Sequence, residues 1–314
     1  MEENFTIKRA VITGGTGMLG LALTRCLTAQ GIEVLLLVHP GSSKVGRIPK
    51  HPLVQVIPCD LENMKDFQPE QPCDAFFHFA WAGTYGDVRN NMYLQNDNIR
   101  YTLDAVELAH RMGCQVFCGA GSQAEYGRVE GKLSGATPVH PETGYGMAKL
   151  CAGQMSRRMC ASYGIRHIWF RILSTYGPFD GPQTMVMSGI RAMLAGERPK
   201  YTKGEQLWDY LYCDDAARAF YLSALKGRDG AVYCIGSGNP RLLREYITVI
   251  RDTAAPGAEI GFGEVPYFEN QVMYLCADIS DLTADTGFVP EVSFEEGIAR
   301  TVAWCREQQT TVGK

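Results

Sequence analysis

The chain has 314 residues, of which 46% are hydrophobic and 20% are charged, and its formal net charge is −4. This composition supplies a substantial core and is typical of a soluble globular protein with one large domain or two modest ones. It contains no dense Lys/Arg block, which argues against a nucleic-acid partner, and its longest apolar runs fall far short of the ~20 residues that span a membrane.

The chain begins with Glu2-Glu3, which matches neither a signal peptide nor a transit peptide, so we expect a cytoplasmic protein. Its eleven cysteines are scattered without a Cys-x-x-Cys pair, and several lie within apolar segments of strand length, such as those around Cys118, Cys213 and Cys234. We therefore interpret the cysteines as reduced core residues and expect no metal site.

The first elements predicted along the chain are a strand, a glycine turn and a helix. The apolar run at 10–13 leads into three glycines spaced three residues apart (Gly14, Gly17 and Gly20), and an amphipathic stretch follows at 21–27. Such a turn lets the backbone approach a pyrophosphate at the positive end of the helix. Gly31 ends the helix, and a buried second strand is predicted at 32–38. These features predict a dinucleotide site.

The end of the second predicted strand bears on the choice of dinucleotide. An NAD enzyme of this kind usually has an Asp or Glu there to accept hydrogen bonds from the adenosine ribose. Here Val38 is followed by residues without a carboxylate that offer contacts to a 2′-phosphate instead: His39, Ser42, Ser43, Lys44 and Arg47. This favours NADP over NAD. The alternative is a solvated basic loop.

Tyr145 and Lys149 lie four residues apart in a stretch predicted to be helical, so they share one face. A lysine ammonium near a phenol favours the phenolate. We therefore expect the tyrosine's pKa to fall toward the range where it exchanges protons with a substrate hydroxyl or carbonyl. The alternative is a half-buried aromatic residue beside a solvated lysine.

Apolar runs of strand length alternate with helical patterns from residue 8 to about 171, as a doubly wound parallel sheet requires. The pattern breaks after 177–182, where short strands, turns and helices rich in Gly and Pro follow. We therefore expect an α/β protein with a Rossmann-like domain at 1–178 and a smaller α+β region at 179–314.

Together these residues resemble the extended short-chain dehydrogenase/reductase superfamily, within it the NAD-dependent epimerase/dehydratase group that acts on nucleotide sugars. The resemblance runs over nearly the whole chain. Its glycine pattern is met by the three glycines of the first turn, and its catalytic pair by Tyr145 and Lys149. The family's serine corresponds to Ser122, four residues before Tyr126-Gly127.

The resemblance implies roles for these residues. Tyr145 is the acid or base at the sugar carbon, Ser122 hydrogen-bonds the same oxygen, and Lys149 holds the nicotinamide ribose. The implied cofactor contacts are Gly14, Thr16, Gly17, Met18, Leu19, Gly20, His39, Asp60, Leu61, Ala80, Tyr145 and Lys149. The implied substrate contacts are Ser122, Gln123, Ser174 and Trp208. The region at 179–314 is then the substrate-binding cap, with the chain returning to the first domain near 208–236, and a homodimer is expected.

Four positions depart from the family pattern. Dehydratases carry an Asp-Glu pair just after the Ser/Thr, where this chain has Gln123 and Ala124, and neither can act as a carboxylic acid or base. Many epimerases have an arginine that binds the pyrophosphate where this chain has Trp208, and an asparagine before the Tyr-Gly-Pro where it has Ser174. Dehydration is therefore disfavoured, and the mode of nucleotide recognition stays open.

We predict from these features an NADP(H)-dependent oxidoreductase that reduces a 4-keto (6-deoxy)hexose of a nucleotide-diphosphate sugar. A nucleotide-sugar 4-epimerase similar to UDP-glucose 4-epimerase is the alternative within the family, because it uses the same Ser122, Tyr145 and Lys149. A regulator that senses NADP(H) without turnover is the alternative from another class.

Overall fold

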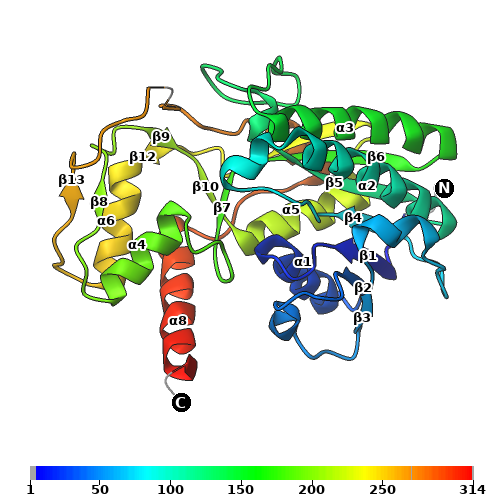
Figure 1. The fold of residues 1–314 in the computed structure, drawn as a ribbon, viewed down its shortest axis with the longest axis horizontal. Coiled ribbons are helices and arrows are strands. Elements are labelled where there is room, and N and C mark those ends of the chain that lie inside the picture. Colours follow the sequence, from blue (N-terminus) through cyan, green and yellow to red (C-terminus); the bar gives the residue numbers. More distant parts are fainter. Residues whose placement is uncertain (1–4, 270, 313–314) are drawn as a thin grey trace.

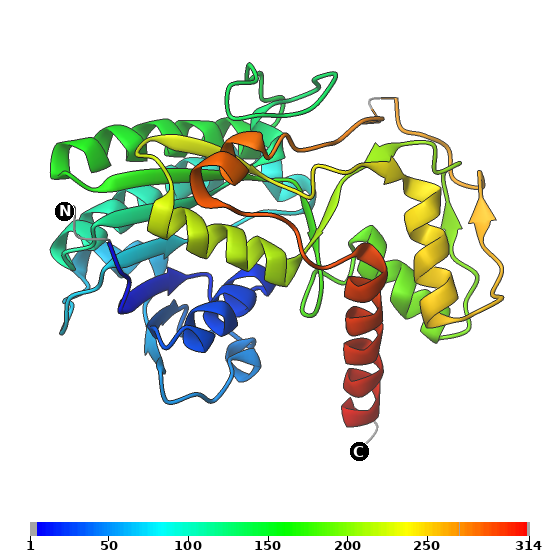
Figure 2. The same cartoon turned by 180° about the vertical axis from the view of Figure 1, so that it is seen from behind.

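A computed structural model of the protein describes residues 5–269 and 271–312. The acidic start of the chain lies outside the described residues. The larger part of the fold is a parallel sheet with helices on both faces, and the smaller part consists of helices and short strands (Figures 1 and 2). No helix among the described residues is long and apolar enough to cross a membrane.

The larger part contains the following elements: β1 (Arg9–Thr13), α1 (Met18–Ala29), β2 (Glu33–Val38), β3 (Val54–Pro58), β4 (Ala75–His78), α2 (Met92–Arg111), β5 (Val116–Ser122), α3 (Gly144–Tyr163), β6 (Arg166–Ile172), α5 (Cys213–Lys226), β11 (Ala231–Ile235) and α7 (Ser280–Thr286). The smaller part and its connections contain β7 (Ser174–Tyr176), α4 (Met185–Leu194), β8 (Lys200–Tyr201), β9 (Leu207–Trp208), β10 (Tyr210–Tyr212), β12 (Arg241–Leu242), α6 (Leu243–Ala254), β13 (Gly261–Phe262) and α8 (Phe294–Val312).

The seven strands of the main sheet are ordered β11-β6-β5-β4-β1-β2-β3, and every neighbouring pair is parallel. The chain therefore leaves β1 toward one edge and later returns to build the other, so the order reverses between β1 and β4. Ligands bind outside the carboxyl ends of the strands at such a reversal. The Rossmann-like fold expected from the sequence is confirmed.

Two helical layers cover the sheet. Helices α1 and α5 contact each other over one face, where residues such as Leu23 and Phe220 are fully buried. Helices α2 and α3 contact each other, and Ala105 and Cys160 belong to the separate core cluster of the other face. Because both faces are covered, strands such as β1 and β2 are almost continuously apolar.

The smaller part is built on α4, α6 and α8, which contact one another. Not all of the chain after residue 179 belongs to the smaller part. The chain returns to the sheet through α5 and β11, and returns again through α7, which contacts both of these elements. The last helix, α8, then runs back to the smaller part (Figure 2).

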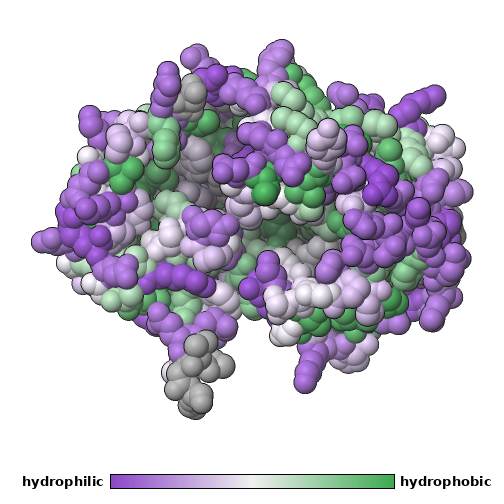
Figure 3. Space-filling model, in the orientation of Figure 1, coloured by the Kyte–Doolittle hydropathy of each residue, from purple (hydrophilic) through white to green (hydrophobic). Residues whose placement is uncertain are grey.

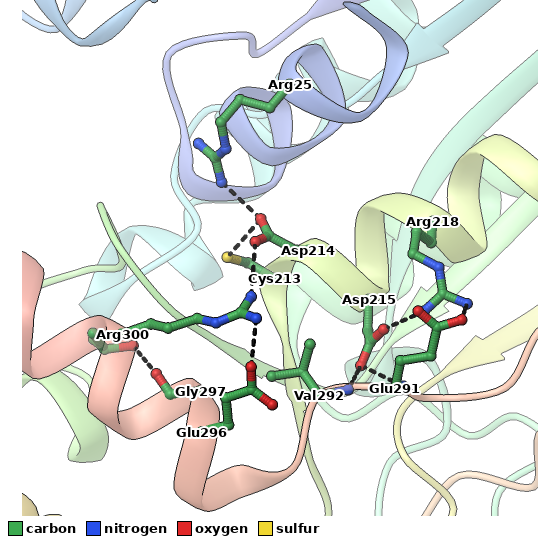
Figure 4. Close-up of polar contacts among 11 residues, drawn as sticks. Arg25, Cys213, Asp214, Asp215, Arg218, Glu291, Val292, Glu296, Gly297 and Arg300 are labelled. Carbon is green, nitrogen blue, oxygen red and sulfur yellow. Dashed lines mark hydrogen bonds and ion pairs between the residues drawn. The ribbon is translucent and has the colours of Figure 1, made fainter. Parts of the chain in front are cut away.

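A polar network at the start of α5 joins the two parts (Figure 4). Asp214 accepts a hydrogen bond from Arg25 of α1 at 2.8 Å, and its second oxygen lies 3.8 Å from Arg300 of α8. The neighbouring Asp215 is buried and accepts backbone hydrogen bonds from Glu291 (3.0 Å) and Val292 (2.8 Å), just before α8. Both carboxylates stand in the first turn of α5, where negative charge is favoured.

Candidate active site

A cleft of about 1280 Å³ lies where the carboxyl ends of the strands meet the smaller part, and Figure 3 shows a hollow with apolar residues on this face of the molecule. All the catalytic, cofactor and substrate residues that the resemblance implied line this one cleft, although they come from elements scattered over two thirds of the chain. These residues are Gly14, Thr16, Gly17, Met18, Leu19, Gly20, His39, Asp60, Leu61, Ala80, Ser122, Gln123, Tyr145, Lys149, Ser174 and Trp208. Of the residues after Val38 that could contact a 2′-phosphate, Ser43 does not line it.

The glycine turn fits a dinucleotide pyrophosphate. Gly14 has φ = 77°, and a Cβ there would lie 2.7 Å from the backbone nitrogen of Ala80, so only glycine is accommodated. Helix α1 begins directly after Gly17, and no side chain caps its first turn. The backbone N–H groups at this positive helix end are therefore left for an anion in the cleft.

The adenosine end of the cleft differs from the sequence-based expectation. No carboxylate follows β2, as predicted, but Asp60 from the end of β3 places its Oδ2 atom 3.3 Å from Nε2 of His39. Asp60 makes no side-chain cap to the 3₁₀ turn that follows it, so its oxygens remain available. No carboxylate follows Val38 in the sequence, but Asp60, which the resemblance implied as a cofactor contact, brings one beside His39 from the adjacent strand, so the sequence-based preference for NADP is not supported.

The predicted pair Tyr145 and Lys149 lies in α3, which begins at Gly144 because the Thr143 side chain caps it by accepting a hydrogen bond from Gly146 N at 3.1 Å. Lys149 is 3% exposed and donates to the carbonyl of Ala120 in β5 at 2.5 Å. Its Nζ atom also lies 3.6 Å from the ring centroid of Trp81 and 5.8 Å from that of Tyr145. Strand β5 and the loop after β4 therefore hold the lysine beside the tyrosine.

The pKa shifts of this pair differ from the expectation, which was that Lys149 lowers the pKa of Tyr145. Burial raises the pKa of the Tyr145 phenol, while a hydrogen bond with Ser122 and the charge of Arg89 act in the opposite direction. Burial also lowers the pKa of Lys149 to about 7, with the charge of Glu125 opposing that shift. The sequence showed the four-residue spacing but not the burial, and here desolvation has the larger effect on both groups.

Ser122 ends β5 and is positioned by a buried carboxylate that the sequence analysis did not assign. Oε1 of Glu125 accepts hydrogen bonds from Ser122 N (2.8 Å) and from Nε1 of Trp169 (2.9 Å). Oε2 of Glu125 pairs with Nε of Arg171 at 2.8 Å, and Glu125 is fully buried. The signal for this role was the Ser-x-x-Glu spacing of a capping box, which the structure forms.

Trp208 and Ser174, two further expected substrate contacts, are hydrogen-bonded to each other. Nε1 of Trp208 donates to Oγ of Ser174 at 2.8 Å. Ser174 begins β7, which pairs in parallel with β10, and β10 begins two residues after Trp208. The donor of the indole and the serine hydroxyl are thus already engaged at the edge of the cleft, which leaves mainly the apolar surface of Trp208 to a ligand.

Three further lining residues were not predicted as site residues. Trp81 follows β4 and donates from Nε1 to Oε1 of Gln95 at 2.9 Å. Arg89 lies over the Tyr145 ring. Asp180 accepts hydrogen bonds from Gly181 N (2.7 Å) and from the Thr184 hydroxyl (2.8 Å), and burial raises its pKa to about 6. None belongs to a short motif, so only the assembled cleft reveals them.

The cysteines and acidic side chains of the described residues form no metal-binding group. All eleven cysteines are free thiols, and burial raises the pKa of most of them, including Cys118 and Cys234. In the part of the chain that the structure describes, no group of three or more His, Cys, Asp or Glu side chains could hold a metal ion.

Comparisons with known proteins define the class. Residues 10–236 match the model of the NAD dependent epimerase/dehydratase family. A dTDP-glucose 4,6-dehydratase of Streptomyces niveus is 25% identical over 96% of this chain and 94% of the relative. The dehydratase of Neisseria gonorrhoeae is 24% identical over 96% of this chain and 97% of its own length.

Solved structures show the same fold. A UDP-N-acetylglucosamine 4-epimerase of Methanobrevibacter ruminantium, in complex with UDP-N-acetylmuramic acid, superimposes with a TM-score of 0.87 at 23% identity, covering 97% of this chain and 100% of that one. The UDP-glucose 4-epimerase of Thermotoga maritima with UDP-glucose gives a TM-score of 0.83 at 25% identity, covering 96% and 99%.

The chain therefore belongs to the NAD-dependent epimerase/dehydratase family of the extended short-chain dehydrogenases/reductases. It is an enzyme of that family, whose cofactor is a nicotinamide dinucleotide. The expectation of a family that modifies nucleotide sugars is confirmed, and the alternative of a regulator without turnover was wrong.

Proposed function

We propose that the protein is a nucleotide-sugar 4-epimerase. The observation that carries this proposal is the composition of the cleft next to Ser122 and Tyr145. Ser122 and Tyr145 both line the cleft, and the serine side chain lowers the pKa of the tyrosine phenol. Gln123 and Ala124, the two residues after Ser122, carry no acid or base. One tyrosine is sufficient for proton exchange at a single sugar carbon, whereas loss of water from neighbouring carbons needs further acid–base groups.

In this proposal Tyr145 removes the proton from the sugar's 4-hydroxyl group and later returns it. Ser122 hydrogen-bonds the same oxygen, and Glu125 holds Ser122 in place through its backbone N–H. Lys149, which lines the cleft beside Tyr145, would hold the nicotinamide ribose. A nicotinamide held there would supply reversible hydride transfer at the sugar carbon.

The comparisons support the epimerase over the reductase predicted from the sequence. The solved relatives include the UDP-glucose 4-epimerase of Thermotoga maritima, whose similarity extends over 96% of this chain. The curated relatives are dehydratases, but this chain lacks the carboxylic acids that their chemistry uses after the Ser/Thr. Asp60 beside His39 also agrees with NAD, because a carboxylate repels a 2′-phosphate.

We further propose that residues 179–314, apart from the return of the chain near 208–236, form the substrate cap. Gln123, Ser174 and Trp208 would contact the nucleotide-diphosphate sugar. A cytoplasmic homodimer is part of the same proposal. Its support is an exposed stripe on α3, in which Met147 and Met155 are 49% and 44% exposed, beside α2 with Tyr93 at 88%.

Reduction of a 4-keto sugar with NADPH is the second candidate. It is favoured by the loop after β2, because Ser42, Lys44 and Arg47 line the cleft and offer a hydroxyl and two cations to a 2′-phosphate. The same Ser122, Tyr145 and Lys149 would then deliver a proton to the ketone oxygen.

Cofactor stoichiometry distinguishes the two candidates. We expect the purified enzyme to interconvert UDP-glucose-type 4-epimers without net change in the absorbance of the nicotinamide, because each hydride taken from the sugar is returned to it. The measurement follows sugar products by chromatography and cofactor by absorbance in the same sample. Oxidation of one NADPH per dTDP- or CDP-linked 4-keto-6-deoxyhexose, with no 4-epimer formed, would establish the reductase instead.

Asp60→Asn is expected to weaken discrimination against NADP. The parental enzyme should bind NAD more tightly than NADP by about tenfold, and the variant should reduce that ratio several-fold, because removing one charge near a 2′-phosphate is worth on the order of 1 kcal/mol at an exposed site. Calorimetric titration with both dinucleotides measures the ratio. Asp66→Asn, an exposed change in the same 3₁₀ turn, serves as the control. Tighter binding of NADP than NAD by the parental enzyme would favour the reductase.

A further inference from the structure

Arg89 belongs to the 3₁₀ turn Gly86–Asn90, which is attached to the start of α3. The Asn90 side chain accepts a hydrogen bond from Gly144 N at 3.0 Å. A Cβ at Gly144 would lie 3.1 Å from the carbonyl oxygen of Arg89, so the two backbones are in close contact at this point. Tyr145 follows Gly144 in the chain. The backbone contact between the two segments therefore fixes the position of the Arg89 backbone relative to Tyr145.

The guanidinium of Arg89 lies over the ring of Tyr145, 4.7 Å from its centroid. Among residues 5–269 and 271–312, no carboxylate lies within ion-pair distance of this arginine. Its Nε atom is buried and has no hydrogen-bond partner. A buried arginine Nε atom without a partner is unusual, because that donor has lost its hydration without compensation, although the residue as a whole is only partly buried.

The other charged and titratable groups around Tyr145 do not replace Arg89. Lys149 lies farther from the ring, at 5.8 Å, and its ammonium is engaged by the Ala120 carbonyl and the Trp81 ring. Glu125 from the turn after β5 raises the pKa of Tyr145, as does Tyr85 from the loop before Arg89. Arg89 is thus the cation that lowers the pKa of the Tyr145 phenol, whereas both of these groups and burial raise it.

We propose that Arg89 is a positioning residue that stabilises the phenolate form of Tyr145 and thereby keeps it available as the base of the reaction. A cation over the ring favours the phenolate over the neutral phenol by charge, and it does so more strongly in a cleft than in water. The inference rests on the proposed function only for the role of Tyr145 as base. The interaction itself is a property of the protein without substrate.

Ultraviolet titration tests the interaction without any turnover. Tyrosinate absorbance is recorded against pH, and the curve of Tyr145→Phe is subtracted from that of the parental enzyme to isolate Tyr145. The same subtraction is made in the Arg89→Met and Arg89→Lys backgrounds. We expect Arg89→Met to raise the pKa of Tyr145 by about one unit, a tenfold lower phenolate fraction at a given pH, and Arg89→Lys to restore most of the difference.

The pH dependence of kcat/KM for epimerisation gives the second readout. Because the phenolate is the active base, the acidic limb should move to higher pH by the same amount in Arg89→Met and return in Arg89→Lys. Arg100→Met removes an arginine of α2 that lies over the Tyr101 ring at the same 4.7 Å and does not line the cleft, and it should leave both readouts of Tyr145 unchanged. Dinucleotide binding by each variant confirms that it is folded.

The outcomes separate the inference from the proposed function. A shifted titration of Tyr145 in a protein that epimerises no sugar would support the role of Arg89 and contradict the epimerase. An active epimerase whose titration and pH profile are unmoved by Arg89→Met would contradict the role of Arg89 and leave the epimerase standing. Equal loss in Arg89→Met and Arg89→Lys, without a shift in pH, would also overturn the inference.

Discussion

Tyr145→Phe is expected to lower kcat by about 1000-fold, because general acid–base catalysis by a positioned side chain contributes roughly 10²–10⁴ in rate. The substitution removes one hydroxyl group that meets Ser122 in the cleft. The ring keeps its edge contact with Trp81, whose centroid lies 6.1 Å away, and its contact with Arg89. We therefore expect a folded protein that still binds dinucleotide but turns over very slowly.

The measurement is the initial rate of Tyr145→Phe at saturating substrate, together with calorimetric titration of the dinucleotide and thermal unfolding. Tyr163→Phe is the matched control, since Tyr163 ends the same helix and stacks on His110 at 4.2 Å, away from the cleft. Its rate should stay within about twofold of the parental value, as for other substitutions away from functional groups. A rate for Tyr145→Phe close to the parental one would remove Tyr145 from the chemistry.

Glu125→Gln is expected to destabilise the protein by about 3 kcal/mol. Glu125 is fully buried and its partner Arg171 is 6% exposed. Removing one charge from such a pair leaves the other uncompensated, which typically costs roughly 3–5 kcal/mol. Ser122 also loses a charged acceptor for its backbone N–H, so kcat should fall as well, because the serine is held less firmly beside Tyr145.

Denaturant unfolding of Glu125→Gln measures the loss of stability, and Glu142→Gln provides the control. Glu142 pairs with Arg128 at the same 2.8 Å, but both side chains are about half exposed, at 47% and 54%. An exposed pair is worth about 0–1 kcal/mol. Equal losses of stability in the two variants would show that the buried pair contributes no more to folding than the exposed one. In Glu125→Gln/Arg171→Met, part of the lost stability should return, because no unpaired charge remains buried.

Local features of the fold were predictable because their causes act within a few residues. The glycine turn after β1, the buried runs of β1 and β2, and the left-handed glycine after α1 follow from backbone geometry and from the burial of a parallel sheet. Tyr145 and Lys149 share a face because the helical period requires it. Once these elements were recognised, the doubly wound order and the meeting of site residues at one edge followed from topology.

Contacts between distant segments were not predictable in the same way. Asp60 reaches His39 from a neighbouring strand, Trp208 binds Ser174, and Arg89 lies over Tyr145. Each pair depends on where loops of different length place two side chains, which no short motif encodes. The reaction was uncertain for the same reason, since reductases and epimerases share the local motif and differ in the surrounding groups.

The pKa values show most clearly what the tertiary structure decides. The sequence determined that a phenol and an ammonium stand on one helical face, and from that spacing a lowered pKa was expected for Tyr145. The assembled cleft buries both groups, raises the pKa of Tyr145 and lowers that of Lys149 to about 7. Spacing along the chain sets which groups meet, whereas desolvation and the charge of more distant residues depend on every segment packed around them, and these set the protonation state.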